Sequence, residues 1–259
     1  MDLISYNGTL CQPSDFPWIR DSGFRYGYGC FETMRVSIGQ VPLFDRHQDR
    51  LLHSLAYFSI PYDASGLYER VLHLISNTRR NGICHIHITG GPMPLVPGAS
   101  PQPTEIISCS ALPKAATTTW EFMHDVPNDY FNHKSMAYAP HIHSLVQATH
   151  WPIYVDPSHV IMDASLFALG CIQNDAIVFA AHTHQVPSVS RDVILSSWTH
   201  SAIHHQPLST SQWQTADCRF ACNAVRGVFE LSTPHTPETN HPFISSMNDL
   251  LGFDNGQLT

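Results

Sequence analysis

The chain has 259 residues, a formal net charge of −8 at pH 7, and 43% hydrophobic against 13% charged residues. This length can form one large domain or two modest ones, and the composition predicts a folded chain rather than extended disorder. Because the basic residues form no cluster, the charge excludes nucleic-acid binding through phosphate neutralisation. No apolar run approaches the roughly 20 residues that a membrane span needs.

The cysteines and the first residues indicate a reducing compartment. The seven cysteines are scattered along the chain without a Cys-x-x-Cys pair, which is typical of free thiols rather than of a disulfide framework or a zinc knuckle. The first residues show no basic segment followed by an apolar one, so no secretion signal is predicted. We therefore expect a cytoplasmic protein without membrane contact.

Residues 1–112 predict a small α+β domain. Asn7-Gly8 is a strong signal for a hairpin between two short strands. Three glycines within residues 23–29 indicate either a tight turn or a close approach of the backbone to something else, and a strand follows. Asp45-x-x-Gln48 has the form of a capping box that begins a helix, which Pro61 ends. Apolar spacing then predicts one helix and two strands, at residues 67–75, 84–88 and 104–110.

The rest of the chain predicts a second, larger domain at residues 120–259, joined to the first by a linker at residues 113–119. Several short apolar strands indicate a barrel-like β core. We expect strands at residues 153–156, 159–165, 167–172, 176–181, 219–222 and 227–231. We expect helices at residues 139–151, from Ser188 onwards, and near residues 245–251.

Lys134 is the first candidate for chemistry, because the chain contains only two lysines, Lys114 and Lys134. An arginine can carry a surface charge in place of lysine, but only a lysine amine can condense with an aldehyde. Lys114 lies in the predicted linker, whereas Lys134 lies among apolar and aromatic residues before a helical pattern. An ordinary solvated lysine remains the alternative on this observation alone.

The 18 histidines include two pairs with alternate spacing, at positions 85 and 87 and at positions 182 and 184. Such pairs can bind zinc, but neither has a third ligand at a suitable spacing. We therefore expect no metal site and interpret these histidines as replacements for other polar residues.

Four segments, in this order, resemble those of the fold-type IV pyridoxal-phosphate (PLP) enzymes. That group contains branched-chain aminotransferases, D-amino acid aminotransferases and aminodeoxychorismate lyases. The segments are residues 26–35 (Tyr-Gly-Tyr-Gly-Cys-Phe-Glu-Thr-Met-Arg), 47–51 (His-Gln-Asp-Arg-Leu), 133–138 (His-Lys-Ser-Met-Ala-Tyr) and 186–191 (Val-Pro-Ser-Val-Ser-Arg). The resemblance covers residues 4 to 231 and implies the two-domain D-amino acid aminotransferase-like fold, PLP as cofactor, and a homodimer.

The resemblance also implies a cofactor site. Lys134 would bond the aldehyde of PLP, and Asp163 would pair with the ring nitrogen where the family uses glutamate. Arg50 and the amides at a helix start would bind the phosphate. Ser188 stands where the family has glycine, which requires a negative φ at this position. The full set of expected cofactor-binding residues is Arg50, Lys134, Tyr138, Asp163, Val189, Ser190, Cys222 and Asn223.

Within the group, residues 222–224 (Cys-Asn-Ala) resemble the lyase. The loop at residues 90–98 lacks the Arg-x-His expected of D-amino acid aminotransferases. The longer N-terminal region and lysine loop of the branched-chain enzymes are not seen either. The implied reaction converts 4-amino-4-deoxychorismate into 4-aminobenzoate, for folate biosynthesis, and pyruvate. An aminotransferase of the same fold and a diverged non-catalytic relative remain the alternatives.

For this reaction, Lys134 would take the C4 proton, and Thr33 or Lys134 would protonate or orient the leaving group. The substrate carboxylates need cationic or amide partners, for which Arg35 and Arg226 are available, and Tyr26 is a further candidate for substrate binding.

Overall fold

The structure is a computed structural model that describes residues 3–12, 18–78, 80–94, 96–113, 118–124, 132–232 and 239–253. The chain forms two compact units, one of Met1–Pro113 with Lys134–Tyr138 and one of Lys114–His133 with Ala139–Thr259. The short segment that carries Lys134 therefore packs with the first unit, although the second unit contains the residues on both sides of it. Within the expected linker at residues 113–119, positions 114–117 lie outside the described residues.

The first unit is built on an antiparallel sheet with the strand order β2-β1-β5-β4-β3. Its strands are β1 (Ile4–Tyr6), β2 (Thr9–Cys11), β3 (Gly29–Val36), β4 (Gly82–Thr89) and β5 (Thr104–Ser110). The predicted hairpin between β1 and β2 is confirmed, since Asn7 and Gly8 both have positive φ, at 47° and 82°. This backbone matches the right-handed twist of the paired strands.

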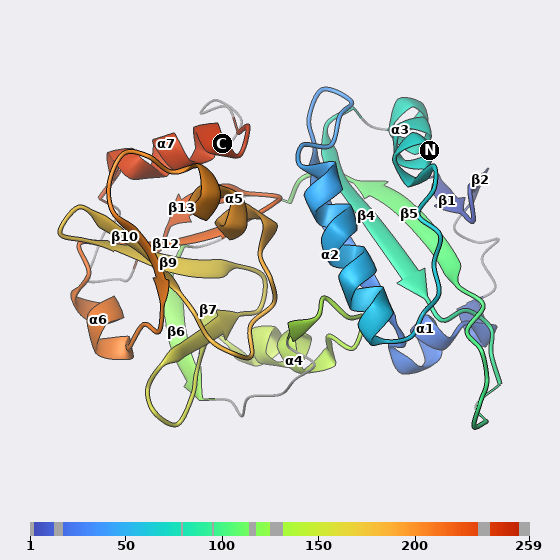
Figure 1. The fold of residues 1–259 in the computed structure, drawn as a ribbon, viewed down its shortest axis with the longest axis horizontal. Helices are drawn as coiled ribbons and strands as arrows, with labels where there is room; N and C mark the ends of the chain where they lie inside the picture. The colour runs from blue at the N-terminus through green and yellow to red at the C-terminus, as the bar shows by residue number, and fades with distance from the viewer. Residues whose placement is uncertain are drawn as a thin grey trace. The chain divides into compact units, whose positions relative to one another are not determined.

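Helices cover one face of this sheet, and α2 crosses it in Figure 1. They are α2 (Phe44–Tyr57) and α3 (Leu67–Asn77). The short helix α1 (Ser22–Tyr26) follows a 3-10 turn at Trp18–Arg20 and contacts the end of β4. The apolar face predicted for α3 is buried, at Leu67, Val71, Leu74 and Ile75. It packs with Met34 and other side chains of β3, β4 and β5 into one core.

The capping box predicted at Asp45 is wrong. Helix α2 begins at Phe44, and its N-cap is Leu43, which has φ 60° and makes no capping hydrogen bond with its side chain. The chain thus enters the helix earlier than the sequence pattern indicates. Asp45 lies in the first helical turn, where its negative charge is favourable beside the exposed backbone N–H groups.

The second unit contains a five-stranded sheet, β11-β10-β9-β12-β13, and a three-stranded sheet, β6-β7-β8. The strands are β6 (Trp120–His124), β7 (Trp151–Val155), β8 (Ile161–Ala164), β9 (Ala168–Gln173), β10 (Ala176–Ala180), β11 (Ile203–Gln206), β12 (Cys218–Asn223) and β13 (Gly227–Glu230). The helices are α4 (Ala139–Gln147), α5 (Val189–Ser197), α6 (Thr210–Thr215) and α7 (Pro242–Leu250). The expected barrel-like core is thus formed by two sheets, and the described strands do not close into a barrel.

One predicted helix in this unit is too long. Residues 139–151 were expected to be helical, but α4 ends at Gln147 and Trp151 begins β7. Trp151 pairs in parallel with Trp120 of β6, a strand that the sequence pattern did not predict. This partner lies 31 positions earlier in the chain. The spacing of apolar residues around Trp151 therefore cannot predict that the two residues pair.

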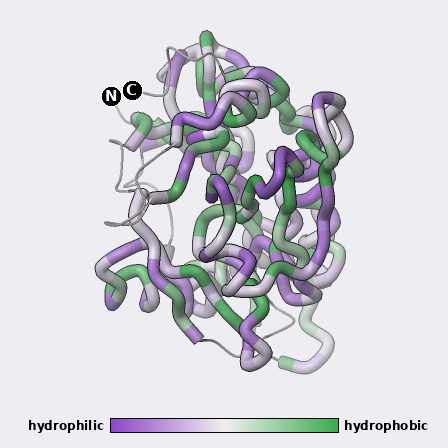
Figure 2. The backbone as a smooth tube through the Cα atoms, turned by 90° about the vertical axis from the view of Figure 1, so that its left-hand side faces the viewer, coloured by the Kyte–Doolittle hydropathy of each residue, from purple (hydrophilic) through white to green (hydrophobic). Residues whose placement is uncertain are grey.

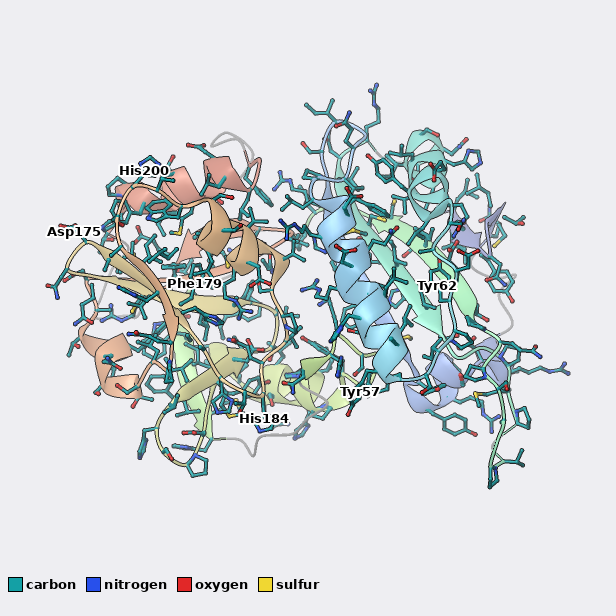
Figure 3. The ribbon with its side chains drawn as sticks, in the orientation of Figure 1. Tyr57, Tyr62, Asp175, Phe179, His184 and His200 are labelled. Atoms are coloured by element: carbon teal, nitrogen blue, oxygen red, sulfur yellow. The ribbon has the colours of Figure 1, made fainter. Side chains whose placement is uncertain are left out.

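The core of the second unit takes side chains from both sheets, including Ile153 and Ile161 from the small sheet and Leu169 and Val178 from the large one. On the other face of the large sheet, Phe179 (labelled in Figure 3) and Phe220 meet edge to face, with ring centroids 5.2 Å apart. Helices α5 and α7 pack together and against strands β12 and β13.

Hydrophobic residues occur in short stretches along the chain, as the alternating green and purple segments of Figure 2 show. Among the described residues, no helix has both the length and the apolar character that crossing a bilayer requires.

Candidate active site

Lys134 is held on the outer edge of β3 by its own backbone. The N–H of Phe31 donates to the carbonyl oxygen of Lys134 at 3.0 Å, and the N–H of Met136 donates to the carbonyl oxygen of Gly29 at 2.8 Å. Between them, Ser135 forms an antiparallel bridge with Cys30. The segment around the lysine is thus joined to the edge of the sheet by a single β-bridge.

Two of the three glycines within residues 23–29, Gly27 and Gly29, make room for this segment. Gly27 has φ 67°, and a Cβ there would lie 3.2 Å from the Cα of Ala137. A Cβ on Gly29 would lie 2.8 Å from the sulfur of Met136 and 2.7 Å from the carbonyl oxygen of Ile88. The close approach expected from these glycines is therefore an approach to the segment that carries the lysine.

The Lys134 side chain lies over an aromatic ring on the sheet face opposite the helices. Its Nζ is 4.3 Å from the ring centroid of Phe31, a distance at which an ammonium group is attracted to the ring face. Tyr138 meets the same ring edge-on, with centroids 5.5 Å apart. Phe31 thus contacts both Lys134 and Tyr138, two of the residues expected to bind the cofactor.

Thr33 and two histidines occupy the same sheet face as Phe31. Thr33 is opposite His85, with Oγ1 3.4 Å from Nδ1, and His87 stacks on Phe31 at 5.9 Å. Burial, followed by the charges of His85 and Lys134, lowers the pKa of His87 to about 4. Burial, followed by the charge of Lys134, also lowers the pKa of His85. Both imidazoles are therefore neutral near pH 7, and the lysine carries the positive charge of this group.

Arg50 forms a two-pronged ion pair with Glu32, which lies on the helix-facing side of β3. Arg50 Nε is 2.7 Å from Oε1, and Arg50 Nη2 is 2.6 Å from Oε2. His47 Nδ1 lies 2.8 Å from the same Oε2. Burial by itself would raise the pKa of Glu32, but Arg50 and the hydrogen bonds from His47 and Arg50 outweigh it and lower the pKa to about 2. Glu32 is thus an anion that is bound to the guanidinium of Arg50, the residue predicted to bind the phosphate.

The two remaining candidates of the first unit lie in different environments. Arg35 is nearly buried on β3, and burial lowers its pKa. Tyr26 ends α1 with about half of its surface exposed, and the guanidinium of Arg25 lies 4.8 Å from its ring centroid. Arg35 is therefore on the strand that carries Phe31 and Thr33, whereas Tyr26 lies at the end of a helix.

In the second unit, the predicted phosphate turn forms the start of α5. Ser188 is the N-cap, with φ −108°, and its side chain accepts the N–H of Arg191. The negative φ meets the condition under which a serine can replace glycine here. Val189 and Ser190 are the first two helical residues, so their N–H groups belong to the set that has no partner within the helix. Such a helix start attracts anions.

Asp163 lies on β8, and its carboxylate is oriented by two backbone N–H groups. Oδ1 accepts from Ala164 at 2.9 Å, and Oδ2 accepts from Val186 at 3.2 Å. Val186 begins the segment that leads into α5. The predicted acid and the predicted phosphate turn are therefore linked directly within the second unit.

Cys222 and Asn223 close β12. Burial raises the pKa of the Cys222 thiol to about 12, so this thiol stays protonated and packs as an apolar group. The Asn223 side chain organises the loop after the strand: Oδ1 accepts from Val225 at 3.0 Å and from Arg226 at 2.8 Å, and Nδ2 donates to Leu166.

Arg226 lies on an aromatic surface in the same loop. Its guanidinium carbon is 3.9 Å from the ring centroid of Phe229 and 6.0 Å from that of Phe167. Its Nη1 is buried and has no hydrogen-bond partner among the described residues. Burial lowers its pKa. A partly desolvated guanidinium with such an unsatisfied N–H group can bind an anion.

Two residues of this group, Glu32 and His47, were not among the site residues predicted from the sequence. The signal for Glu32 was a lone acid within the apolar strand pattern Cys-Phe-Glu-Thr-Met, because a buried carboxylate requires a cationic partner. The signal for His47 was its spacing of three from Arg50 on one helix, which places both side chains on the same helix face.

Comparison with known proteins gives a family and a fold. The family model described as amino-transferase class IV matches residues 29–232. A 4-amino-4-deoxychorismate lyase from Pseudomonas aeruginosa has a similar structure, with a TM-score of 0.83 and 20% identity over 96% of this chain and 98% of that one. The branched-chain amino acid aminotransferase from Escherichia coli gives 0.84 and 15% identity over 99% and 97%.

A third similar structure is the PLP-bound form of a hypothetical aminotransferase from Mycobacterium tuberculosis, with a TM-score of 0.81 and 15% identity over 96% of this chain and 97% of that one. No curated protein matches the sequence. At these identities the structural likeness establishes the fold, while the family model establishes the family.

Proposed function

Because the chain belongs to the class IV aminotransferase family, we propose that it is a PLP-dependent lyase that converts 4-amino-4-deoxychorismate into 4-aminobenzoate and pyruvate. The observation that carries the proposal is Lys134, one of only two lysines, whose backbone is paired to β3 and whose amine lies over Phe31. The cofactor of this family, pyridoxal 5′-phosphate, supplies an aldehyde and a ring that accepts electrons from the substrate carbon next to the amine.

Lys134 has two proposed tasks. Its amine would hold the cofactor through the aldehyde, and as a free amine it would take the proton from C4 of the substrate. The imidazoles of His85 and His87 lie near this amine. Both are neutral, so neither forms an ion pair with it. Thr33 lies on the same face, and we propose that its hydroxyl orients or protonates the leaving pyruvate group, with His85 fixing its direction.

The phosphate has two proposed partners. In the first unit it is the guanidinium of Arg50, which can hold two oxygens in a fork. In the second unit it is the start of α5, where the N–H groups of Val189 and Ser190 precede the first internal helix bonds. Both features suit a dianion, and the buried Cys222 and the ordered loop at Asn223 support the strand beside α5.

Asp163 is the proposed partner of the ring nitrogen. Its carboxylate is held by the N–H groups of Ala164 and Val186, so it is ordered before any ligand binds. A negative charge here keeps the ring nitrogen protonated, which lets the ring accept electrons. Tyr138, edge-on to Phe31, is proposed to donate to the phenolic oxygen of the cofactor.

The substrate carries two carboxylates, and we propose Arg35 and Arg226 as their partners, with Tyr26 as a further contact. Arg226 has the stronger support, because its buried Nη1 lacks a partner among the described residues and the rings of Phe167 and Phe229 hold the guanidinium in place.

The chain's two lysines allow a matched test. Wild type, Lys134→Ala and Lys114→Ala would be purified with PLP, reduced with borohydride and mapped by mass spectrometry. We expect the cofactor on Lys134 alone, and a visible absorbance band at about 410–430 nm that Lys134→Ala removes and Lys114→Ala keeps. With 4-amino-4-deoxychorismate, wild type should release equal amounts of 4-aminobenzoate and pyruvate without any keto acid. PLP binding without these products would show the lyase assignment to be wrong.

An aminotransferase is the second candidate, because the matching family model is described by that activity and solved aminotransferases share the fold. Amino-group transfer from an amino acid to a keto acid, with no release of pyruvate from 4-amino-4-deoxychorismate, would favour it. A non-catalytic relative would show neither reaction and no visible band.

We also propose a homodimer, as the resemblance to fold-type IV enzymes implies. Light scattering during size-exclusion chromatography should give twice the mass of one chain, and the mass of a single chain would contradict this proposal.

A further inference from the structure

A row of polar side chains crosses the sheet of the first unit, on the face that carries Phe31. Thr33 of β3 is directly opposite His85 of β4, and Thr33 Oγ1 lies 3.4 Å from His85 Nδ1. The other ring nitrogen of His85, Nε2, lies 3.3 Å from Oγ of Ser110 on β5. One imidazole therefore bridges two hydroxyl groups that belong to the two neighbouring strands.

The two ends of this row differ in their access to water. Thr33 and His85 are partly buried, whereas Ser110 is exposed. Ser110 is also the last residue of β5, so its hydroxyl lies where the strand ends. The row thus leads from the surface of the protein to the hydroxyl that is proposed to act on the leaving group.

The hydrogen bonds of His85 permit either tautomer of its ring. A hydroxyl can both donate and accept a hydrogen bond, and a neutral imidazole donates from one nitrogen and accepts at the other. Neither hydroxyl has a second hydrogen-bond partner in the part of the chain that the structure describes. Both tautomers can therefore keep two hydrogen bonds, and a change of tautomer, which moves a proton across the ring, costs no hydrogen bond.

The surroundings of His85 keep its ring neutral. Burial, followed by the charge of Lys134, lowers the pKa of His85, so a ring that carries two protons is disfavoured. This property suits a group that passes a proton on instead of retaining it. The distances of 3.3 and 3.4 Å are long for hydrogen bonds, which is common for catalytic contacts before the substrate is bound.

We propose that His85 relays a proton from Ser110 at the surface to Thr33. In the proposed elimination, the bond from the substrate ring to the pyruvate group breaks, its electron pair stays with the leaving group, and the Thr33 hydroxyl gives its proton to that pair. Nδ1 of His85 then gives a proton to Thr33, and Nε2 takes one from Ser110, which regains one from water. This inference rests on the proposed function, since it takes Thr33 as the donor to the leaving group.

The protons of this sequence balance. One proton enters at Ser110 for each proton that leaves Thr33, and His85 ends as the other neutral tautomer. Gain of a proton at Nδ1 with loss of one from Nε2 restores the first tautomer between turnovers. Lys134 returns the C4 proton to the solvent, so the reaction consumes no proton overall.

His85→Gln separates the relay from a purely structural role. The glutamine amide can bridge the same two hydroxyls, because its oxygen accepts and its nitrogen donates, but it cannot pass a proton from one end to the other during turnover. We expect kcat for 4-aminobenzoate release to fall by about 10²-fold, as loss of a proton-transfer group predicts, with KM within about twofold of wild type. Full activity of His85→Gln would overturn the relay.

His85→Ala and His87→Ala form a matched pair for chemical rescue. Both remove an imidazole from the same face of β4, but only His85 bridges two hydroxyls among the described residues. Free imidazole can occupy the space that His85 leaves, so adding it should raise kcat of His85→Ala by about tenfold and leave kcat of His87→Ala as it was. Equal rescue of both variants, or rescue of neither, would contradict the relay.

The tautomers of His85 can also be observed without any reaction and without a variant that must fold. In the full chain with isotope-labelled histidine, purified without substrate, nuclear magnetic resonance should show averaged chemical shifts for the two ring nitrogens of His85, because both tautomers are populated and exchange. Separate shifts for one protonated and one unprotonated nitrogen would show a fixed tautomer and overturn the inference. Averaged shifts in a wild type that yields no 4-aminobenzoate would instead refute the proposed function.

Discussion

Phe31 and Lys134 contact each other twice. The backbone N–H of Phe31 donates to the Lys134 carbonyl at 3.0 Å, and the Lys134 amine lies 4.3 Å from the centre of the Phe31 ring. The first contact places the main chain of the lysine, and the second places its side chain. The reactive amine is therefore positioned by β3, a strand about a hundred residues earlier, rather than by the helix that follows it.

Gly29→Ala should disturb this arrangement. The added Cβ would meet the carbonyl oxygen of Ile88 at 2.7 Å and the sulfur of Met136 at 2.8 Å, so the strand or the lysine segment must move. We expect a loss of about 1–3 kcal/mol in the free energy of unfolding and slower reaction of Lys134 with pyridoxal. Denaturant unfolding and the rate of appearance of the visible band measure the two effects, and an unchanged rate would show that the close approach does not position the lysine.

Asp163→Asn should lower kcat by about 10²–10³-fold, the usual size for loss of one electrostatic stabiliser in an active site. The amide keeps an oxygen acceptor but removes the negative charge that stabilises a protonated ring nitrogen. Asp163→Glu, which restores the usual residue of the family, is the control and should retain much of the activity. Steady-state kinetics of 4-aminobenzoate formation measures this, and full activity of Asp163→Asn would show that another group performs the task.

Arg226→Met should raise KM for 4-amino-4-deoxychorismate by about tenfold and leave kcat within about twofold, because it removes one charged contact to a substrate carboxylate. The variant should be at least as stable as wild type, since Nη1 is buried without a hydrogen-bond partner among the described residues. An unchanged KM would assign Arg226 to packing on Phe229 alone.

His87→Phe should make stability less dependent on pH below neutrality. Burial lowers the pKa of His87 from 6.5 to about 4, so between these values the unfolded chain binds a proton that the folded chain excludes. The contribution that neutral His87 makes to the free energy of unfolding is therefore fully present above pH 6.5, and it is lost as the pH falls towards 4. The phenylalanine cannot take up a proton and can still stack on Phe31.

The expected difference between wild type and His87→Phe is up to about 3 kcal/mol in the change of unfolding free energy from pH 7 to pH 4. Urea unfolding across this range measures it. The pKa values of His47 and His85 are lowered as well, so the variant should retain part of the slope. Parallel curves for the two proteins would contradict the prediction.

The elements that follow from local patterns could be predicted from the sequence. The buried face of α3, the β5 strand and the Asn7-Gly8 hairpin each depend on the spacing of neighbouring residues. The start of α2 could not, because Leu43 in the left-handed region begins the helix before the apparent capping box. Strand β6 could not be predicted from local patterns either, since its partner β7 lies far along the chain.

The same distinction applies to the candidate site. Lys134 could be found from its rarity and its family motif, but its position on β3 depends on pairing between distant segments. Glu32 and Arg50 are 18 positions apart on a strand and a helix, so no local periodicity relates them. Only the requirement that a buried carboxylate has a partner could have pointed to the pair.

The pairing of the lysine segment with β3 has a consequence for the integrity of the protein. Strand β3 is the last strand of its sheet, and the backbone of the lysine segment pairs with Gly29–Phe31 at the start of its outer edge. An uncovered edge strand is a template for aggregation. A fragment ending at Pro113 would lack this cover, so it should self-associate through β3, and a peptide containing residues 132–138 should suppress that association. The chain thus covers the start of this edge with the same segment that carries its reactive amine.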